Sequence, residues 1–518
     1  MPDNLGLFVG RAVARMLPLL SSYYKNCRGA WRRWKLVVLS RWPIFGWALL
    51  YLLVAGALQL YSSYPFDADT AYHAVVGRLI REHGILHAFP WTPLSWLAEH
   101  YADKELLFHL LFVPLTGVSW ITASKIVGTV AGATVILSLY LVLRAEGVRL
   151  AGLWALVPLA VSGVFVFRFA LVRPHLLSIA LALVVLWAAA RGRLMILAVT
   201  SFIYPWAYVA WQLPIVFILI AGGTRILCGE RLWWKPAAAT LAGLALGVTL
   251  HPNAANLVRL SWIQLVDVLF KNAWGAKEGF ELGGEFQPFT YVQWARWLLG
   301  STLMALAGLV LAWRKRRDDV TALAFSLAAL MFGLLTVRTM RFAEYFVPFS
   351  VASLALSARS IPWRFFPQVI LGASAIYTAA VGSGTVTALS IRGDDLPPSI
   401  AETLRRQIPP GSQVFTCEWG LTGTLMAALP DRHFIVALDP TFFYVKDPEL
   451  YRLWRRICRE APPDMSGTIR RRFGARYALC LGSKQSASFV APLIAEPGVR
   501  TLLVSASWIL FDLGDPSP

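Results

Sequence analysis

The chain has 518 residues, of which 57% are hydrophobic and only 15% are charged, and its mean hydropathy is +0.57. A soluble protein of this length would carry about 25% charged residues, so the composition excludes an ordinary soluble enzyme and indicates a polytopic protein of the lipid bilayer. The formal net charge is +19. The basic residues cluster in short connections between apolar runs, and the sequence shows no basic domain with a nucleic-acid-recognition motif. Nucleic acid is therefore not an expected partner.

The N-terminal segment, residues 1–41, carries eight Lys and Arg residues against one acid, Asp3. No small-residue cleavage site follows the first long apolar run, so we do not interpret the segment as a cleavable signal peptide. Apolar and basic residues alternate from Leu5 to Leu20, which is typical of an interfacial helix on an anionic leaflet. The segment is therefore expected on the cytoplasmic side.

Apolar runs near the length needed to cross a bilayer recur through residues 42–386, the predicted transmembrane domain. Eleven spans are predicted, at about 43–61, 122–143, 151–167, 174–190, 194–210, 212–228, 236–251, 296–313, 320–337, 345–358 and 367–386. With a cytoplasmic start, every connection after an even-numbered span is basic, as the positive-inside rule requires. The C-terminus then lies outside, and the protein is expected in the inner (plasma) membrane with a periplasmic C-terminal domain.

The segment from Leu106 to Thr122 is apolar enough to span, but His109, Pro114 and Gly117 interrupt it. We interpret it as a helix along the outer interface, since a crossing here would turn the later basic connections outward. Three outer segments are long, namely residues 62–121, residues 252–295 and the C-terminal region 387–518. Outer loops of this length are usually functional or structured.

The C-terminal region alternates strand and helix patterns, which predicts a small α/β domain. The expected strands are 413–416, 433–438, 475–480, 499–504 and 508–512, and the expected helices are 399–407, 448–460 and 486–495. The five cysteines form no close pair with metal-ligand spacing. Cys417, Cys458 and Cys480 would allow one disulfide if this region is extracytoplasmic, and no obligatory disulfide framework is predicted.

An Asp-x-Asp pair, Asp67 and Asp69, follows the first span. Pro65 ends that span, and Asp67 can cap an amphipathic helix that starts near Asp69. Asp69 and His73 are four residues apart and share a face of that helix. A carboxylate near a histidine can act as a general base or bind a cation, while helix capping with an interfacial histidine is the structural alternative.

A second acidic motif, with Glu278, Glu281 and Glu285 among three glycines, lies in the outer loop 252–295. Glycines permit a close approach to a ligand, and such loops often gate a site. A solvated linker is the alternative. The nearby Phe280, Phe286, Phe289 and Tyr291 make the loop too apolar for a plain spacer.

Basic residues also face outward in this topology, against the positive-inside trend. They are Arg168, Arg173 and His175 between the third and fourth spans, and Arg338 and Arg341 after the ninth. Such a cluster would suit a phosphate or pyrophosphate through bidentate hydrogen bonds. The alternative is internal ion pairing, for example of Arg341 with Glu344. The candidate substrate contacts are aromatic residues and one histidine on the same side, namely Tyr72, His73, Trp206 and Tyr345.

The motif Phe66 to His73, the loop Glu278 to Glu285 and the segment Arg338 to Tyr345 resemble GT-C glycosyltransferases, across about residues 43–386. These multi-span enzymes use polyprenyl-phosphate-linked sugars, and oligosaccharyltransferase catalytic subunits place an acidic motif and a glutamate loop similarly. The resemblance implies a polytopic α-helical membrane protein of GT-C type, and the sequence pattern adds the small C-terminal α/β domain. The chain lacks the Trp-Trp-Asp motif of those subunits. Between the third and fourth spans, where those subunits carry another acidic motif, the chain carries Arg168, Arg173 and His175.

The resemblance implies transfer of a sugar or oligosaccharide from a polyprenyl-(pyro)phosphate donor to a glycan, lipid or protein acceptor on the extracytoplasmic face. Asp67 or Asp69 would remove the acceptor proton in one displacement, which favours inversion, and the arginines would stabilise the departing phosphate. A divalent cation, Mg²⁺ or Mn²⁺, would be held by Asp67, Asp69 and Glu285 if one is used. The alternatives are a transporter or flippase of lipid-linked saccharides, and a non-catalytic partner in polysaccharide or glycoprotein assembly.

Overall fold

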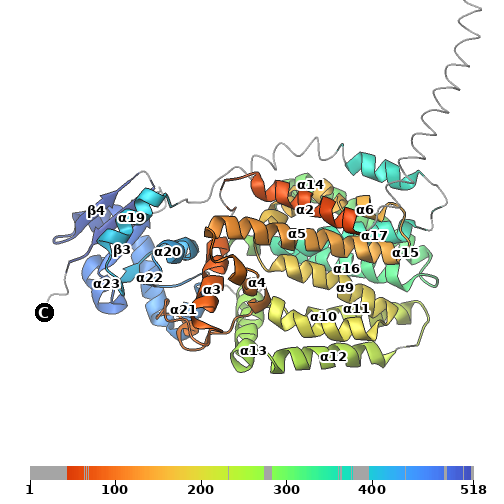
Figure 1. Ribbon diagram of the computed structural model, residues 1–518, viewed down its shortest axis with the longest axis horizontal. Coiled ribbons are helices and arrows are strands. Elements are labelled where there is room, and N and C mark those ends of the chain that lie inside the picture. Colours follow the sequence, from red (N-terminus) through yellow and green to blue (C-terminus); the bar gives the residue numbers. More distant parts are fainter. Residues whose placement is uncertain are drawn as a thin grey trace, which may run out of the picture.

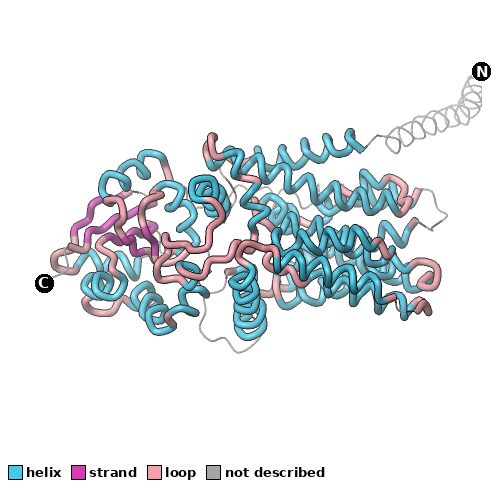
Figure 2. Tube along the Cα trace, turned by 60° about the horizontal axis from the view of Figure 1, so that its bottom comes forward, coloured by secondary structure: helices cyan, strands magenta, loops and turns pink. Residues whose placement is uncertain are grey.

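The computed structural model describes residues 44–514 apart from residues 64, 66, 68, 232, 274–282, 360, 362–364, 375, 377–395, 438, 483–486 and 506. Long helices lie roughly side by side in one bundle, and a smaller region that contains a β-sheet lies at one end of it (Figure 1). In Figure 1 the helices α3 Asp69–His83, α4 Leu106–Leu110 and α13 Ala254–Trp262 lie between these two parts. Figure 2 shows the strands together at one end of the molecule, away from the long helices.

Nine helices of the bundle form within a few residues of predicted spans, because backbone N–H and C=O groups in lipid must be paired within the chain, which favours helix. They are α2 Ile44–Leu60, α5 Trp120–Ala145, α9 His175–Arg191, α10 Leu194–Ala207, α11 Leu213–Leu227, α12 Trp234–Thr249, α15 Leu299–Arg314, α16 Val320–Arg338 and α17 Ala343–Ala358. Pro205 in α10 and Pro348 in α17 do not end their helices. Among the described residues, α5 and α16 could each cross a bilayer unaided by length and composition. Two bent pairs raise this number to as many as four if each pair forms one span, namely α8 Gly163–Ala170 with α9 and α14 Tyr291–Trp297 with α15. The count of eleven spans stays a prediction, and the described part of the last one covers residues 367–374 and 376.

Two predicted helices are broken into shorter ones. The span expected at 151–167 consists of α6 Ala151–Trp154, α7 Val157–Val161 and α8 Gly163–Ala170. Pro158 starts α7, and Ser162 is extended and caps α8 with its hydroxyl, so the chain cannot continue as one helix. Between α8 and α9 it bends by 115°. Likewise, the single interfacial helix expected from Leu106 forms two short helices, α4 Leu106–Leu110 and η2 Val113–Leu115.

Close helix packing in the bundle depends on small residues. Helix α17 packs against both α15 and α16. A Cβ atom at Gly308 in α15 would lie 2.2 Å from the Ser353 hydroxyl of α17, so only glycine allows this approach. This close packing holds α17 against α15, and Glu344 lies in the first turn of α17.

The outer segments carry several short helices. The first loop contains α3 Asp69–His83, η1 Trp96–Ala98, α4 and η2, and the second contains α13 Ala254–Trp262, the π-helix η3 Ile263–Ala273, η4 Gly284–Phe286 and α14 Tyr291–Trp297. One more short helix, η5 Met340–Phe342, joins α16 to α17.

Residues 396–514, here called the C-terminal α/β region, contain a five-stranded sheet in the order β2-β1-β3-β5-β4. Its strands are β1 Gln413–Phe415, β2 His433–Phe434, β3 Tyr477–Leu481, β4 Arg500–Val504 and β5 Trp508–Asp512. β1 runs parallel to β2 and β3, whereas β5 is antiparallel to β3 and β4. The helices are α19 Pro398–Gln407, α20 Thr422–Ala428, α21 Thr441–Lys446, α22 Pro448–Glu460, α23 Met465–Phe473 and α24 Ala487–Ala495. All five strands and the three helices expected there form.

The C-terminal α/β region packs on the first outer loop. Tyr72, Val76 and Leu79 of α3 share one buried apolar core with Leu425 and Leu429, which lie in and just after α20. Figure 1 shows α3 beside α20 and α21. The start of α3, where the Asp-x-Asp pair lies, is therefore enclosed between the bundle and this region.

A disulfide joins Cys417 to Cys458, while the other two cysteines of the described chain, Cys228 and Cys480, are free and buried. The pair holds α22 against the loop after β1. Disulfides persist mainly in oxidising compartments, which agrees with an extracytoplasmic position for this region.

Replacement of Cys417 and Cys458 by serine is expected to destabilise the C-terminal α/β region. The closed loop has a sequence separation of 41, and the chain-entropy relation for such a loop gives about 4 kcal/mol. Thermal unfolding with and without reductant measures the effect. The Cys480→Ser variant is the control, and an unfolding temperature that the double variant leaves unchanged would contradict the expectation.

Candidate active site

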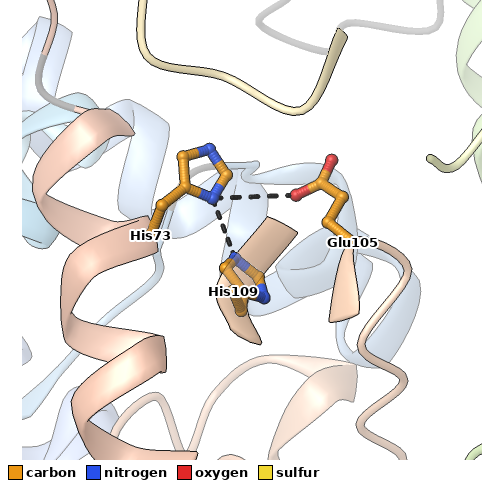
Figure 3. Close-up of side chains that lie close together, drawn as sticks. All are labelled: His73, Glu105 and His109. Atoms are coloured by element: carbon orange, nitrogen blue, oxygen red, sulfur yellow. Dashed lines mark hydrogen bonds and ion pairs between the residues drawn. The ribbon is translucent and has the colours of Figure 1, made fainter. Parts of the chain in front are cut away.

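The Asp-x-Asp pair lies at the N-terminus of α3, and Asp67 caps the helix as predicted. The Thr70 backbone amide donates to Asp67 Oδ1 at 2.9 Å, and Asp69 is the first helical residue. His73, one turn further on, does not contact Asp69. Its Nδ1 lies 2.8 Å from His109 Nε2 and 3.9 Å from Glu105 (Figure 3). Capping of α3 uses only Oδ1 of Asp67. The other oxygen stays available for a contact in the candidate active site, so Asp67 can serve both purposes.

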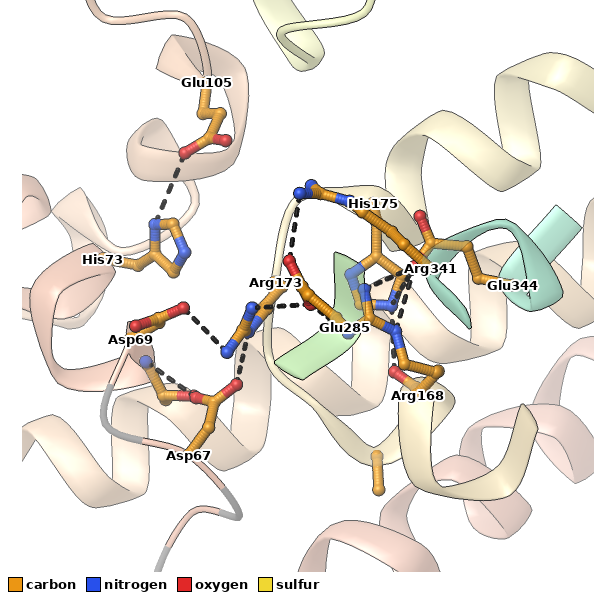
Figure 4. A network of polar contacts seen from close by, with 12 residues as sticks. Asp67, Asp69, His73, Glu105, Arg168, Arg173, His175, Glu285, Arg341 and Glu344 are labelled. Atoms are coloured by element: carbon orange, nitrogen blue, oxygen red, sulfur yellow. Dashed lines mark hydrogen bonds and ion pairs between the residues drawn. The ribbon is translucent and has the colours of Figure 1, made fainter. Parts of the chain in front are cut away.

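Arg173 joins the acids of the two predicted acidic motifs. It lies in the bend between α8 and α9, and its Nε donates to Asp67 Oδ2 at 2.5 Å while its Nη2 lies 2.7 Å from Asp69 Oδ2. Its Nη1 lies 3.6 Å from Glu285 Oε2 (Figure 4). The carboxylates expected to hold Mg²⁺ or Mn²⁺ thus surround a guanidinium. This donor set does not fit a metal ion at the same place, and we derive no step through one there.

Glu285 lies close to three arginines that come from separate elements of the fold. Besides Arg173, Arg168 Nη1 lies 2.6 Å from Glu285 Oε2, and Arg341 Nη1 lies 3.0 Å from Oε1. Burial alone would raise the pKa of this carboxyl, but the three arginines hold its pKa well below the ordinary value. Glu285 is therefore a fully ionised anion at the point where the arginines meet.

Glu344, which sequence reasoning named only as a possible partner of Arg341, pairs instead with Arg168. Arg168 Nη2 and Nε lie 2.6 and 3.0 Å from Glu344 Oε2, and the glutamate side chain is 0% exposed. Its other oxygen, Oε1, is buried without a hydrogen-bond partner in the described structure. Arg341 donates its second contact to the Tyr208 hydroxyl at 3.1 Å. Tyr208 follows an apolar helix and carried no signal in the sequence.

The cluster balances three guanidinium groups against the carboxylates of Asp67, Asp69, Glu285 and Glu344. Burial raises the pKa of the Asp69 carboxyl to about 6, Arg173 opposes this rise, and Asp67 and Glu285 add to it. A carboxylate with a pKa near 6 is a stronger base than ordinary aspartate and is still ionised at neutral pH.

Of the other predicted residues, His175 adjoins this cluster, with its Nε2 4.0 Å from Glu344 Oε2, whereas Tyr345, Trp206 and Tyr72 have hydrogen-bond partners elsewhere. His175 Nε2 donates to the Arg168 carbonyl at 2.9 Å, and the Tyr345 hydroxyl bonds Ser178 at 2.7 Å within the bundle. Trp206 donates to the Gly247 carbonyl at 2.9 Å. Tyr72 is buried near Tyr101.

The remaining predicted residues are Arg338, Glu278 and Glu281. Arg338 is exposed at the last residue of α16, whereas Arg341 lies within the network. Glu278 and Glu281 lie outside the described residues.

No protein-family model matches the sequence, and no curated protein sequence matches it significantly. Solved structures match its fold. One is the arabinofuranosyltransferase AftD from Mycobacteria, with a TM-score of 0.55 and 19% identity over 90% of this chain. The match covers 41% of that protein, so the chain spans about two fifths of its length.

A second matching structure is ArnT from Cupriavidus metallidurans bound to undecaprenyl phosphate. It has a TM-score of 0.55 and 14% identity, and the match covers 91% of this chain and 99% of ArnT. The apo form of ArnT matches equally well in TM-score, with 13% identity. Identities this low show the fold alone. The chain therefore shares the fold of the arabinofuranosyltransferase AftD and of ArnT.

Proposed function

We propose that the protein transfers a sugar or oligosaccharide from a polyprenyl-(pyro)phosphate donor to an acceptor on the extracytoplasmic face. The observation that carries this proposal is the convergence of Arg168, Arg173 and Arg341 on one carboxylate, beside an aspartate of raised pKa. An anion-binding group next to a general base is what displacement of a phosphate from a sugar requires.

The arginines bind the donor phosphate in this proposal, and Glu285 is the anion that the phosphate displaces. Glu285 belongs to a 3₁₀ turn of an outer loop, whereas Arg168 lies in the last turn of α8 and Arg341 lies in η5 between the packed helices α16 and α17. Exchange of a loop carboxylate for a phosphate keeps the arginines paired before and after binding, so neither state leaves buried charge uncompensated. The undecaprenyl phosphate in the matching ArnT structure supports this ligand class.

Asp69 acts as the base. The acceptor oxygen attacks the anomeric carbon, and its proton passes to the Asp69 carboxylate. The bond between the anomeric carbon and the phosphate oxygen breaks, and its electron pair stays on the phosphate, where the arginines stabilise the charge. One displacement without a covalent intermediate inverts the anomeric configuration.

A small cavity lined in part by Tyr72, which follows Asp69 in the first turn of α3, is the proposed entry for the acceptor. The first loop contributes Tyr72, Tyr101 and Lys104 to its lining, and the C-terminal α/β region contributes Asp439 and Phe442. Aromatic faces and charged groups together suit a glycan, whose hydroxyls need hydrogen-bond partners. The C-terminal α/β region would thus form one wall of the acceptor site.

The proposed topology places this end of the bundle outside the inner (plasma) membrane. The disulfide lies in the region beside the site. At the far ends of α5, α9 and α17, Arg191 and Arg359 pair with Glu146 in connections predicted to be cytoplasmic. Eleven spans and a cytoplasmic N-terminus complete the proposal.

Replacement of Arg341 by alanine is expected to weaken donor binding and slow transfer. Loss of one charge-assisted contact to a phosphate costs about 1.5–3 kcal/mol, which is roughly 10- to 150-fold in kcat/KM. Arg341→Lys should restore part of this loss, because it keeps the charge without the bidentate geometry.

The measurement uses the full chain in nanodiscs with a polyprenyl-phosphate sugar, and follows donor binding and sugar transfer separately. Arg314→Ala, at the exposed end of α15, is the control. Movement of the intact lipid-linked sugar across the bilayer without bond cleavage would instead establish a flippase. Unchanged donor binding in Arg341→Ala would refute the phosphate site.

A further inference from the structure

A second cluster of buried polar residues, made by His73, Glu105 and His109, lies next to the acid–arginine network. The ligand atoms of these three side chains all lie within 4.8 Å of one another. His73 Nδ1 is 2.8 Å from His109 Nε2 and 3.9 Å from Glu105 Oε2, as the dashed lines in Figure 3 show. All three side chains are at least nine-tenths buried.

The local sequence explains how these groups meet. Glu105 is the N-cap residue of α4, and His109 follows in the last turn of that helix. The side chain of His73 projects from α3, one turn after Asp69 (Figure 4). Two short helices from the two ends of one loop therefore direct a carboxylate and two imidazoles at a common point.

Asp103 fixes the orientation of one imidazole. Its two carboxylate oxygens lie 2.7 and 2.9 Å from His109 Nδ1, so the Nδ1 hydrogen is donated to Asp103. The lone pair of His109 Nε2 then faces His73 Nδ1. A carboxylate that holds the far nitrogen of a histidine in this way is the usual outer-shell partner of a metal-binding imidazole.

The spacing also fits a metal ion. Zinc binds nitrogen and carboxylate oxygen at about 2.0–2.2 Å in tetrahedral geometry, which separates neighbouring ligand atoms by about 3.3 Å. The observed separations of 2.8 and 3.9 Å lie on either side of that value.

We propose that His73, Glu105 and His109 bind one divalent transition-metal ion of the zinc class, with the fourth coordination position open to the adjoining cavity. Glu105 and His109 themselves line that cavity, together with Tyr72, Lys104 and Asp439. Two nitrogen ligands and one carboxylate favour zinc over Mg²⁺ or Ca²⁺, which prefer all-oxygen sites. Three protein ligands with an open position are typical of zinc sites that hold water or a substrate group.

The site is distinct from the one that the sequence predicts at Asp67, Asp69 and Glu285. A bound ion would tie α3 to α4 and hold the first turn of α3, which carries Asp69. The competing explanation is a plain hydrogen-bond chain from His73 through His109 to Asp103. That chain accounts for both imidazoles but not for the buried Glu105 carboxylate, which lies 3.9 Å from His73 and outside hydrogen-bond range.

The test measures metal binding, which does not depend on sugar transfer. The full chain in detergent, freed of any affinity tag and stripped with a chelator, is titrated with Co²⁺ as the spectroscopic substitute and then with Zn²⁺. We expect one ion per chain, visible absorption of four-coordinate cobalt, and displacement of that cobalt by Zn²⁺. Glu105→Gln should weaken binding at least tenfold, and Asp103→Asn by about 10- to 100-fold.

The matched control is His83→Gln, because His83 is an exposed histidine at the end of the same helix and should bind cobalt as the wild type does. Thermal unfolding of each variant separates lost binding from lost folding. Wild-type protein that gives no four-coordinate cobalt spectrum would overturn the proposal, whatever the variants do. Equal cobalt affinity in the wild type and in folded Glu105→Gln would also overturn it.

Discussion

Asp69→Asn is expected to lower sugar transfer by about 10²- to 10⁴-fold, the usual contribution of a positioned general base. Asparagine keeps the size of the side chain and can still accept a hydrogen bond from Arg173, which lies 2.7 Å from Asp69 Oδ2. It cannot take the acceptor proton at neutral pH. Donor binding should therefore remain while the chemical step is lost, which single-turnover transfer with a lipid-linked donor measures.

Two further variants make this result specific. Asp67→Asn keeps its oxygen for the Thr70 amide and should retain more activity than Asp69→Asn if Asp69 is the base. Asp431→Asn, at a side chain that is 70% exposed in the C-terminal α/β region, should leave transfer unchanged. Full transfer by Asp69→Asn would remove Asp69 from the mechanism.

The same assignment fixes the direction of the pH dependence. The pKa of Asp69 is raised to about 6, and only the ionised carboxylate can accept a proton. Transfer should therefore rise with pH through about 6 and level off above it. A rate that falls over this range would contradict a base at Asp69, and Asp69→Asn should abolish this limb of the profile.

Arg168→Ala is expected to destabilise the protein by about 3–5 kcal/mol, because it strands a buried carboxylate. Glu344 is 0% exposed and relies on Arg168 for two contacts to Oε2. Glu285 would lose its contact at 2.6 Å as well. The loss should appear as a lower thermal unfolding temperature in detergent and as a smaller fraction of folded protein in the membrane.

A second substitution separates charge from packing. Arg168→Met combined with Glu344→Gln removes both charges of the buried pair, so it should recover a large part of the stability lost in Arg168→Met alone. Transfer should stay low in the double variant, because the phosphate has lost one arginine. Equal stability of the single and double variants would show that the pair is not coupled.

The sequence by itself determined most of the helices and strands. A long apolar run has one stable form in lipid, and alternating patterns with turn residues specify strands locally. The Asp67 cap was also predictable, since its partner Thr70 is three residues away. Helix breaks were less predictable. Pro158 and Ser162 lie within an otherwise apolar run, so a hydropathy pattern predicts neither the helix breaks at these residues nor the 115° bend that follows.

The candidate site was predictable in its residues and not in its pairings. Acids and arginines on one face were evident from topology, but only the tertiary structure decided that Arg173 lies between Asp67, Asp69 and Glu285, and that Arg168 rather than Arg341 takes Glu344. The same holds for Cys417 with Cys458, and for His73 with His109 rather than Asp69. The physical reason is that hydropathy and capping act over a few residues of chain. Pairing among buried charges depends on which side chains the helix packing brings within about 3–4 Å, since electrostatic energies in a low dielectric change steeply over that range.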